Sequence, residues 1–419
     1  MSSRKCALEA IGRVIDGGAF NNIALSGLYN KYSLSAEDKS LCGIIVKGVL
    51  ERKLTLDFFI SKLSVFPIDE LDKRVLNLLR MSIYQIFYLD RVPDFAVCNE
   101  SVNIASELGK KKKGFVNGVL RNACRRKKEL FESLENAPRF VRYSLDEKLY
   151  SLLSEQYGDA AEQIAERYFE KGASSIRVNP LKTTAAELSR KLSEMGVGCE
   201  TLSERTVVVT DNFSKVLELL EDGEFYVQGL SSQRAVEVLE AKRGDFVVDV
   251  CACPGGKTVG AAMDMQNEGE IHSFDIHENK LPLIEKNAAT LGITIVKTEK
   301  HNSKKINEKY IEKADKVICD VPCSGIGSIG KRPEIRYKSI DDINGLVETQ
   351  KSILSSSVRY LKKDGALVYS VCSINKNEGE YLVREFLTEN EDFCLVYEET
   401  VLPSKGCDGF YIGKIAYKK

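Results

Sequence analysis

The stretch FVVDVCACPGGKT, residues 246 to 258, contains the pattern that decides the fold. The apolar residues from Phe246 to Val250 predict a buried strand. The glycine pair Gly255 and Gly256 predicts a tight turn, and VGAAMDM after it is compatible with a helix. A strand, a glycine turn and a helix form the first unit of a doubly wound α/β fold, which binds ligands at the carboxyl ends of its strands.

The chain after residue 239 repeats this alternation, which predicts a parallel sheet with an antiparallel edge and helices on its faces. Strands are expected at residues 245–251, 270–276, 293–298, 315–321 and 365–372, with two more near 393–398 and 409–417. Helices are expected at about 257–266, 278–291, 341–362 and 376–388. Residues 239–419 are therefore interpreted as a C-terminal α/β, Rossmann-like domain.

Two further domains are expected before the sheet. Residues 1–135 show apolar residues at helical spacing, clearest from Val75 to Phe87, and predict an all-α bundle. Residues 136–238 mix helical patterns with the short strand candidates SSIRVN, RTVVVT and EFYVQ, which predict a small α+β linker domain. The fold class is therefore multidomain.

The composition is that of an ordinary cytoplasmic protein, with 43% apolar and 29% charged residues and a formal net charge of -1. The first residues, MSSRKCALEA, lack the apolar core of a signal peptide. No stretch approaches the ~20 apolar residues that span a bilayer, so no membrane partner is expected. The chain is expected to be a monomer. A nucleic-acid partner would need a local basic patch.

One such patch lies at residues 109–128, GKKKKGFVNGVLRNACRRKK, which hold nine Lys or Arg and no acid. Charge runs usually form a solvated helix face. Here apolar residues such as Phe115 and Val119 would anchor the segment while the charges flank them. Binding to a phosphate backbone and simple solvation both remain open.

Three ligands compete for the loop after the first strand. No GxGxxG motif is present, so a dinucleotide is disfavoured. Gly256-Lys257-Thr258 ends like a P-loop, and Asp320 closes an apolar strand as a magnesium-binding acid would. However, Cys251 stands where the first P-loop glycine belongs, and Pro254 lacks a backbone donor for phosphate.

S-adenosylmethionine fits this loop better, because its adenosine and amino-acid ends need a polar turn without a phosphate cradle. Asp275 closes the next strand about 20 residues farther on and could accept hydrogen bonds from both ribose hydroxyls. The predicted cofactor is therefore S-adenosylmethionine. From the residues themselves, its candidate binding groups are the loop that begins at Cys251 and the carboxylate of Asp275.

The 12 cysteines are too scattered for a secreted disulfide framework. Five of them fall at or just beyond predicted strand ends: Cys251, Cys253, Cys319, Cys323 and Cys372. A shared zinc site is the rival interpretation, but CxC and CxxxC are unusual zinc spacings and the three histidines are not placed to help. No metal site is predicted.

Two of these cysteines, Cys323 in DVPCSG and Cys372 in YSVCS, follow the fourth and fifth strands. Their loops should meet the cofactor loop over one cleft. Thiols beside a methyl donor suggest covalent catalysis on a weak carbon nucleophile: a thiolate that adds to carbon 6 of a pyrimidine activates carbon 5. Cys323 or Asp320 could assist the release of the product. The alternative is that both are small buried apolar residues.

Together these motifs resemble the RNA (cytosine-5)-methyltransferase family, in particular its bacterial RsmB (Fmu, Sun) branch. The similar blocks are DVCACPGGKT (249–258), FDI (274–276), DVPCSGIG (320–327), KRPEIRY (331–337), YSVCS (369–373), RVNP (177–180), VQGLSSQRA (227–235) and DGFYIGKI (408–415). YLDRVPDFAVCNESV (88–102) and GFVNGVLR (114–121) are similar to the NusB-type RNA-binding domain.

The resemblance implies methylation of carbon 5 of a specific cytosine in small-subunit (16S) ribosomal RNA through a covalent cysteine–cytosine adduct. It makes Cys372 the nucleophile and Cys323 the cysteine that releases the product. The cofactor-binding residues that it implies are Cys251, Ala252, Cys253, Pro254, Gly255, Gly256, Lys257, Asp275, Asn302 and Asp320. Arg332 and Arg336 become candidate phosphate ligands. Asn302 replaces the family's usual acid and Gly229 a common aspartate. An RNA-binding scaffold without S-adenosylmethionine binding and a P-loop ATPase remain the alternative functions.

Overall fold

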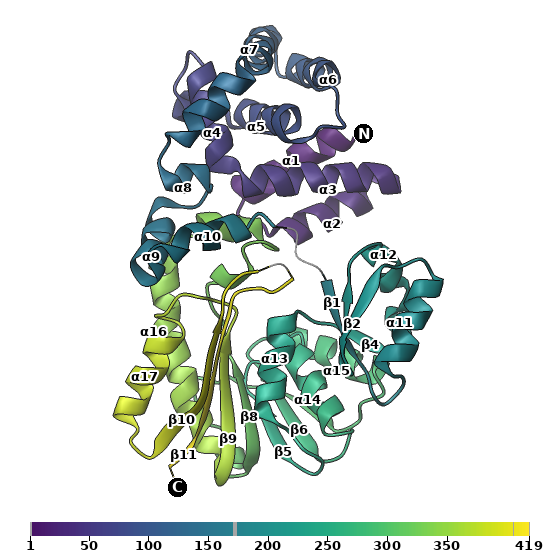
Figure 1. Ribbon diagram of the computed structural model, residues 1–419, viewed down its shortest axis with the longest axis vertical. Helices are drawn as coiled ribbons and strands as arrows, with labels where there is room; N and C mark the ends of the chain where they lie inside the picture. Colours follow the sequence, from purple (N-terminus) through teal and green to yellow (C-terminus); the bar gives the residue numbers. More distant parts are fainter. Residues whose placement is uncertain (1, 171–173, 405, 419) are drawn as a thin grey trace. The chain divides into compact units, whose positions relative to one another are not determined.

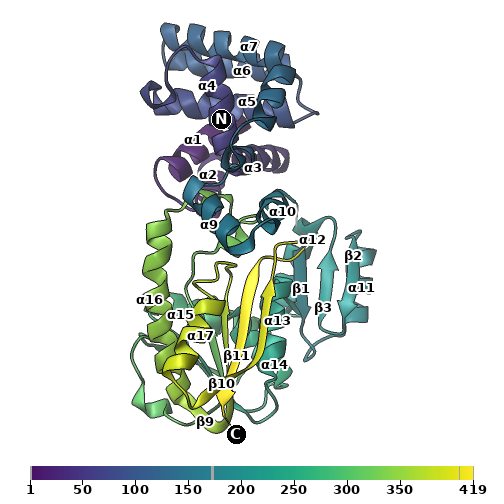
Figure 2. The ribbon, with the colours of Figure 1, turned by 60° about the vertical axis from the view of Figure 1, so that its left-hand side comes forward.

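The computed structural model describes residues 2–170, 174–404 and 406–418, without the side chain of Asp341. The chain divides into two compact units, of which Figures 1 and 2 show the elements. The first unit comprises Met1–Glu166 and Arg332–Ser339, and the second comprises Arg167–Lys331 and Ile340–Lys419. The chain therefore leaves the second unit after Lys331 and returns to it at Ile340.

The first unit is helical, as predicted for residues 1–135, and it contains further helices beyond them. Its α-helices are α1 (Ser3–Ile15), α2 (Asn21–Tyr32), α3 (Ala36–Glu51), α4 (Lys53–Leu63), α5 (Lys73–Tyr88), α6 (Asp94–Glu107), α7 (Lys110–Glu135), α8 (Arg139–Arg142), α9 (Glu147–Tyr157) and α10 (Ala160–Arg167). Helix α5 is the central one, because every residue from Val75 to Phe87 is buried. Arg80 within it forms an ion pair with Asp57 of α4, with 2.6 Å between Nε and Oδ1. The charge inside this apolar helix is therefore compensated.

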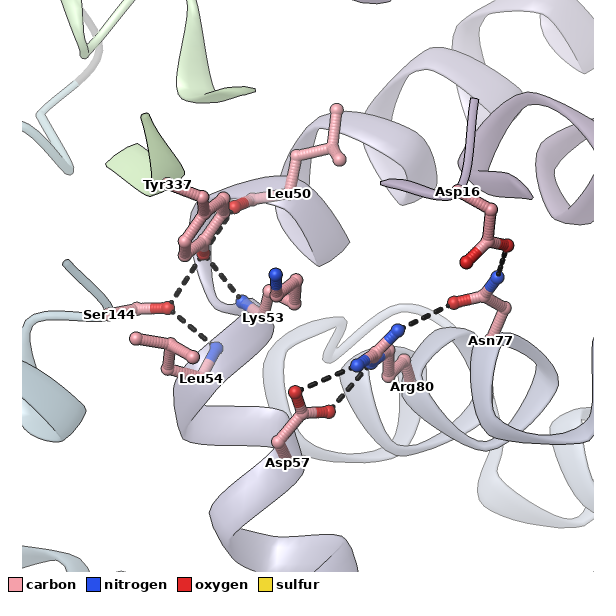
Figure 3. A network of polar contacts seen from close by, with 9 residues as sticks. All are labelled: Asp16, Leu50, Lys53, Leu54, Asp57, Asn77, Arg80, Ser144 and Tyr337. Carbon is pink, nitrogen blue, oxygen red and sulfur yellow. Dashed lines mark hydrogen bonds and ion pairs between the residues drawn. The ribbon is translucent and has the colours of Figure 1, made fainter. Parts of the chain in front are cut away.

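Residues 332–339 pack within the helical unit through Tyr337, whose ring lies among α3, α4 and the segment before α9 (Figure 3). The Tyr337 hydroxyl donates to the carbonyl of Leu50 at 2.7 Å and accepts from the backbone N–H of Lys53 at 3.0 Å. It also lies 2.9 Å from the hydroxyl of Ser144. Burial raises the pKa of Tyr337 to about 12, so the hydroxyl keeps its proton and remains a donor at neutral pH.

Arg336 corrects one sequence-based expectation. The guanidinium is fully buried and donates from Nη1 to the carbonyl of Tyr143 at 2.8 Å, so it is not an exposed phosphate ligand. The backbone carbonyl of Arg336 accepts from the N–H of Asp146 at 2.8 Å. Arg336 therefore stabilises the packing of residues 332–339 in the helical unit, whereas Arg332 is exposed.

The second unit begins with a small antiparallel sheet in the order β2-β3-β1-β4. Its elements are β1 (Ser174–Val178), α11 (Ala185–Glu194), β2 (Cys199–Ser203), β3 (Thr206–Val209), α12 (Phe213–Val216) and β4 (Phe225–Val227). Three of the strands match the predicted segments, and β2 was not predicted. Buried Arg177 of β1 pairs at 2.7 Å with Asp264, the last residue of helix α14 (Gly256–Asp264), which links the small sheet to a helix of the larger sheet's layer.

The seven-stranded sheet of the second unit has the order β10-β11-β9-β8-β5-β6-β7. Its strands are β5 (Phe246–Asp249), β6 (Glu270–Asp275), β7 (Val296–Lys300), β8 (Ala314–Asp320), β9 (Leu361–Val371), β10 (Phe393–Val401) and β11 (Phe410–Tyr417). Strands β5 to β9 pair in parallel, and β11 pairs antiparallel with β9 and β10. The predicted parallel core with an antiparallel edge is confirmed.

Helices cover both faces of this sheet (Figure 1). They are α13 (Leu230–Leu239), α14 (Gly256–Asp264), α15 (Leu281–Thr290), α16 (Ile340–Ser357) and α17 (Glu380–Glu389). Alternate strand residues supply two cores: Val247 and Ile318 pack with α13 and α14, while Val248 and Val317 pack with α16 and α17. No helix among the described residues is both long and apolar enough to span a bilayer.

Candidate functional site

The loop Cys251–Lys257 follows β5 and includes the first two residues of α14, Gly256 and Lys257, in the strand–turn–helix order that the sequence predicts. The backbone N–H of Gly255 donates to the carbonyl of Ala252 at 2.6 Å, which closes the turn. Gly255 has a φ of 100°, and a Cβ there would lie 3.2 Å from Ile284. The backbone conformation therefore favours glycine, and the space for a larger residue is tight. The peptide bond between Cys253 and Pro254 is cis.

Three further predicted residues lie at the carboxyl ends of neighbouring parallel strands. Asp275 is the last residue of β6, Asp320 is the last of β8, and Asn302 follows β7. Oδ1 of Asp275 accepts from the backbone N–H of His277 at 2.8 Å, and within the described residues Oδ2 accepts no hydrogen bond. That free carboxylate oxygen is the acceptor that a ribose hydroxyl requires, so the edge fits an adenosine-containing ligand.

Lys257 reaches from the first loop to the fourth strand rather than into solvent. Its Nζ lies 2.6 Å from Oδ2 of Asp320, and the Lys257 side chain is 11% exposed. The hydroxyl of Ser370 on β9 donates to the other oxygen of Asp320 at 2.8 Å. The ammonium also lies 5.3 Å from the centre of the Phe410 ring. A lysine engaged in this way already has its anion, which disfavours the P-loop alternative.

Asp249, at the end of β5, is a buried acid that the sequence analysis did not single out. Only 1% of it is exposed, and the Thr258 hydroxyl donates to Oδ2 at 2.6 Å. Burial raises the pKa of Asp249 from its ordinary 3.8 to about 7, against the opposing effect of the Thr258 hydrogen bond. In the sequence, the only indication that Asp249 belongs to the site is its position directly before the loop that was predicted to bind the ligand.

The raised pKa of Asp249 predicts a pH-dependent stability. Between about pH 4 and 7 the folded protein holds a proton that the unfolded chain has released, so the free energy of unfolding falls as pH rises, by roughly 4 kcal/mol at most. Asp249→Asn has no carboxyl group and should not lose stability in this way as pH rises. We expect the difference between its thermal midpoint and that of the wild type to increase by several degrees from pH 5 to pH 8, measured by calorimetry. The exposed Asp392→Asn is the control, and an equal pH response of both variants would contradict the assignment.

The two predicted catalytic cysteines meet. The Sγ atoms of Cys323, after β8, and Cys372, after β9, are 3.0 Å apart. The pKa of Cys323 is raised well above its ordinary value, first by the hydrogen bond with Cys372, then by burial, and then by the negative charges of Cys372, Glu378 and Asp320. Cys323 is therefore the sulfur that keeps its proton at neutral pH.

The remaining cysteines at the strand ends lie apart from this pair. Cys319 is fully buried within β8 and contacts Ser357, whereas Cys251 and Cys253 belong to the first loop. Nearby Asp275 and burial both raise the pKa of Cys253, burial more strongly. Among the residues that the structure describes, no three His, Cys, Asp or Glu side chains are arranged to hold a metal ion.

Two family models and known relatives match this chain. The family model for the 16S rRNA methyltransferase RsmB/F matches residues 236–415, and the NusB family model matches residues 1–125. A probable ribosomal RNA small subunit methyltransferase B of Bacillus subtilis (strain 168) is 34% identical over 400 residues, which cover 94% of this chain and 89% of that protein.

Solved structures show the same architecture. The crystal structure of PH0851 matches with a TM-score of 0.80 and 26% identity, covering 99% of this chain and 98% of that chain. NSun6 from Pyrococcus horikoshii, solved with the S-adenosylmethionine analogue SFG, shares the fold at a TM-score of 0.58 and 22% identity, covering 65% of this chain and 98% of that one. The predicted methyltransferase fold, its S-adenosylmethionine cofactor and the NusB-like helical region are confirmed. Because the similarity to the Bacillus protein extends over nearly the whole chain, this protein belongs to the RsmB/F family of 16S rRNA methyltransferases.

Proposed function

We propose that this enzyme methylates carbon 5 of a cytosine in small-subunit ribosomal RNA through a covalent adduct between Cys372 and the base. The observation that carries the proposal is the 3.0 Å separation of the Cys323 and Cys372 sulfurs, at the same sheet edge as the loop Cys251–Lys257. Carbon 5 of a cytosine is too weak a nucleophile to take a methyl group unaided. A thiolate that adds to carbon 6 breaks the 5,6 double bond and moves its electron pair to carbon 5.

The two thiols take different roles in this proposal. Cys323 keeps its proton in the resting enzyme and a protonated thiol is a poor nucleophile, so we assign the attack on carbon 6 to Cys372. Once the Cys372 sulfur is bonded to carbon 6, its hydrogen bond and its charge no longer oppose ionisation of Cys323. Cys323 can then release its own proton to solvent and, as a thiolate, take the proton from carbon 5. The 5,6 double bond re-forms, the bond between Cys372 and carbon 6 breaks, and its electron pair returns to the Cys372 sulfur.

The cofactor supplies an electrophilic methyl group on its sulfonium when it is bound. We assign its binding to the loop Cys251–Lys257, to Asp275 for the ribose and to Asn302 beside the adenine, because these groups line the carboxyl edge of β5, β6 and β7. Asp320 lies between this edge and Cys323, and its ion pair with Lys257 fixes its orientation. Asp320 is thus the boundary between the cofactor and the base.

The basic helix α7 is the proposed RNA contact of the helical unit. Val116, Leu120 and Ala123 bury its apolar side, as the sequence predicts. Five of its cationic side chains are exposed and form no ion pair with any described residue: Lys110, Lys111, Lys113, Arg121 and Arg125. By contrast, Lys112 pairs with Asp72 and Arg126 with Glu129. Unpaired cations on an anchored helix suit a phosphate backbone.

Replacing Lys110, Lys111 and Lys113 by glutamine is expected to weaken binding to ribosomal RNA most strongly at low salt. Each lost phosphate contact should reduce the slope of log Kd against log salt by about one. The measurement is RNA binding by fluorescence anisotropy at several salt concentrations. The control replaces Lys31, Lys39 and Lys73, three exposed lysines of the same unit, by glutamine. Equal slopes for both triple variants would exclude α7 as the contact.

The function itself is tested by mapping 5-methylcytosine in ribosomal RNA from cells with and without the gene, and by methylating unmodified RNA with the purified enzyme. We expect one cytosine of the small-subunit RNA to lose its methyl group and to regain it in vitro. Methyl transfer to another atom or another RNA would overturn the proposal. Binding to RNA without binding to S-adenosylmethionine, measured by calorimetry, would instead support an RNA-binding scaffold.

A further inference from the structure

A buried carboxylate, Glu378, joins the loops that carry the two cysteines. It lies in the turn between β9 and α17 and is fully buried. Its Oε1 accepts from the backbone N–H of Ser324 at 2.7 Å and from Nε2 of Gln350 at 3.0 Å. Its Oε2 accepts from the hydroxyls of Ser324 at 2.5 Å and Ser373 at 2.6 Å. Four donors therefore converge on one side chain that carries no cationic partner in these contacts.

The bonded residues make this arrangement specific to the cysteine pair. Ser324 directly follows Cys323, and Ser373 directly follows Cys372. The two serine hydroxyls are also 3.1 Å from each other, and both serines are buried. Each serine bonded to Glu378 is therefore separated from a reactive cysteine by one peptide unit. A displacement of Glu378 would move both loops, and with them both thiols.

Neighbouring contacts hold the carboxylate itself in place. The Tyr369 hydroxyl donates to the backbone carbonyl of Glu378 at 2.7 Å. Nε2 of Gln350 also donates to the carbonyl of Pro322, the residue before Cys323, at 3.0 Å. Glu378 is thus fixed by β9 and α16 as well as by its own turn, which is what a rigid support for two reactive groups requires.

We propose that Glu378 is a positioning residue for the methyl transfer, a single carboxylate that sets the separation of the two thiols and their orientation toward the base. The inference rests on the proposed function, because it supposes that both thiols react. Three groups that can carry a negative charge lie near Cys323, namely Cys372, Glu378 and Asp320. The charge of Glu378 therefore favours the protonated form of Cys323, after the larger effects of the Cys372 hydrogen bond and burial.

The test compares Glu378→Gln with Glu378→Ala in the full-length protein. A glutamine oxygen can still accept from Ser324 N–H and Gln350, and its amide can donate to the two serine hydroxyls, which can reverse their own hydrogen bonds. Glu378→Gln is therefore expected to fold and bind S-adenosylmethionine as the wild type does, while its kcat falls about tenfold at an unchanged KM for RNA. Glu378→Ala leaves buried donors unsatisfied and should lower kcat at least about a hundredfold.

A second readout does not depend on catalysis. The alkylation of Cys323 by iodoacetamide is followed by peptide mass spectrometry over a pH series, with Cys372→Ala in every compared protein so that the neighbouring thiol does not react first. It should reach half its maximal rate at a pH about half a unit lower in Glu378→Gln, because the negative charge is gone. If the substitution only made Cys323 more accessible to iodoacetamide, the maximal alkylation rate would change, but the pH of half-maximal rate would not. Glu380→Gln, which removes a charge two residues away that contacts Thr400 and Lys376, is the control.

The two readouts separate failure of this inference from failure of the proposed function. If Glu378→Gln matches Glu380→Gln in both kcat and the alkylation profile, Glu378 is not a positioning residue. If the wild type transfers no methyl group to cytosine but the alkylation profile still shifts, the proposed function fails while the coupling of Glu378 to Cys323 stands. If Glu378→Ala does not fold, Glu378→Gln alone decides.

Discussion

Cys372→Ala is expected to reduce methyl transfer to unmodified small-subunit ribosomal RNA at least about a thousandfold, which corresponds to about 4 kcal/mol of transition-state stabilisation. Without this sulfur no bond to carbon 6 can form, and carbon 5 remains a weak nucleophile. The partner thiol cannot replace it, because the single remaining sulfur cannot hold carbon 6 and take the proton from carbon 5 in the same adduct. The measurement is the transfer of a radiolabelled methyl group under saturating cofactor and RNA.

The matched control for this variant is Cys394→Ala. Cys394 is a partly buried cysteine of the same unit, on β10, and its sulfur donates a hydrogen bond to the carbonyl of Tyr417 at 4.0 Å, away from Cys323 and Cys372 in the chain. It should retain full activity. Both variants should bind S-adenosylmethionine and RNA with wild-type affinity, since neither removes a predicted binding group. Full activity of Cys372→Ala would refute the covalent mechanism.

Much of the second unit was predictable because its sequence signals are local. The alternation of apolar runs and helical patterns defines β5 to β9, and the loop after each strand lies at one sheet edge by the geometry of a parallel sheet. That geometry is why Cys323 and Cys372, 49 residues apart in the chain, could be placed together before the structure. The short strand β2 was missed because Cys199–Ser203 has no alternating apolar pattern.

The sequence did not predict contacts that depend on long-range packing. Arg336 and Tyr337 follow the DVPCSG motif, yet they pack among helices about 200 to 290 residues earlier in the chain. Glu378 is one of many acids in a charged turn, and only the folded structure shows that it is buried and bonded to Ser324 and Ser373. Charge in a sequence normally indicates exposure, so a buried and satisfied charge gives no local signal.

Cys323→Ala is expected to give the opposite phenotype to Cys372→Ala, because it blocks the end of the reaction instead of its beginning. The alanine cannot take the proton from carbon 5, so the bond between Cys372 and carbon 6 does not break. The variant should stop after about one turnover and accumulate a protein–RNA adduct that survives denaturing electrophoresis, with turnover reduced at least about a hundredfold.

The adduct itself can be tested in two further variants. Cys323→Ala combined with Cys372→Ala should form none, because the bond to the base requires the Cys372 sulfur. Cys319→Ala changes a buried cysteine on the same strand as Asp320 but outside the pair, and should form no stable adduct. Mass spectrometry of the trapped complex should find the nucleotide on the peptide that contains Cys372. If Cys323→Ala instead turns over repeatedly without an adduct, proton removal belongs to another group, and Asp320, whose carboxylate adds to the charge around Cys323, is the next candidate.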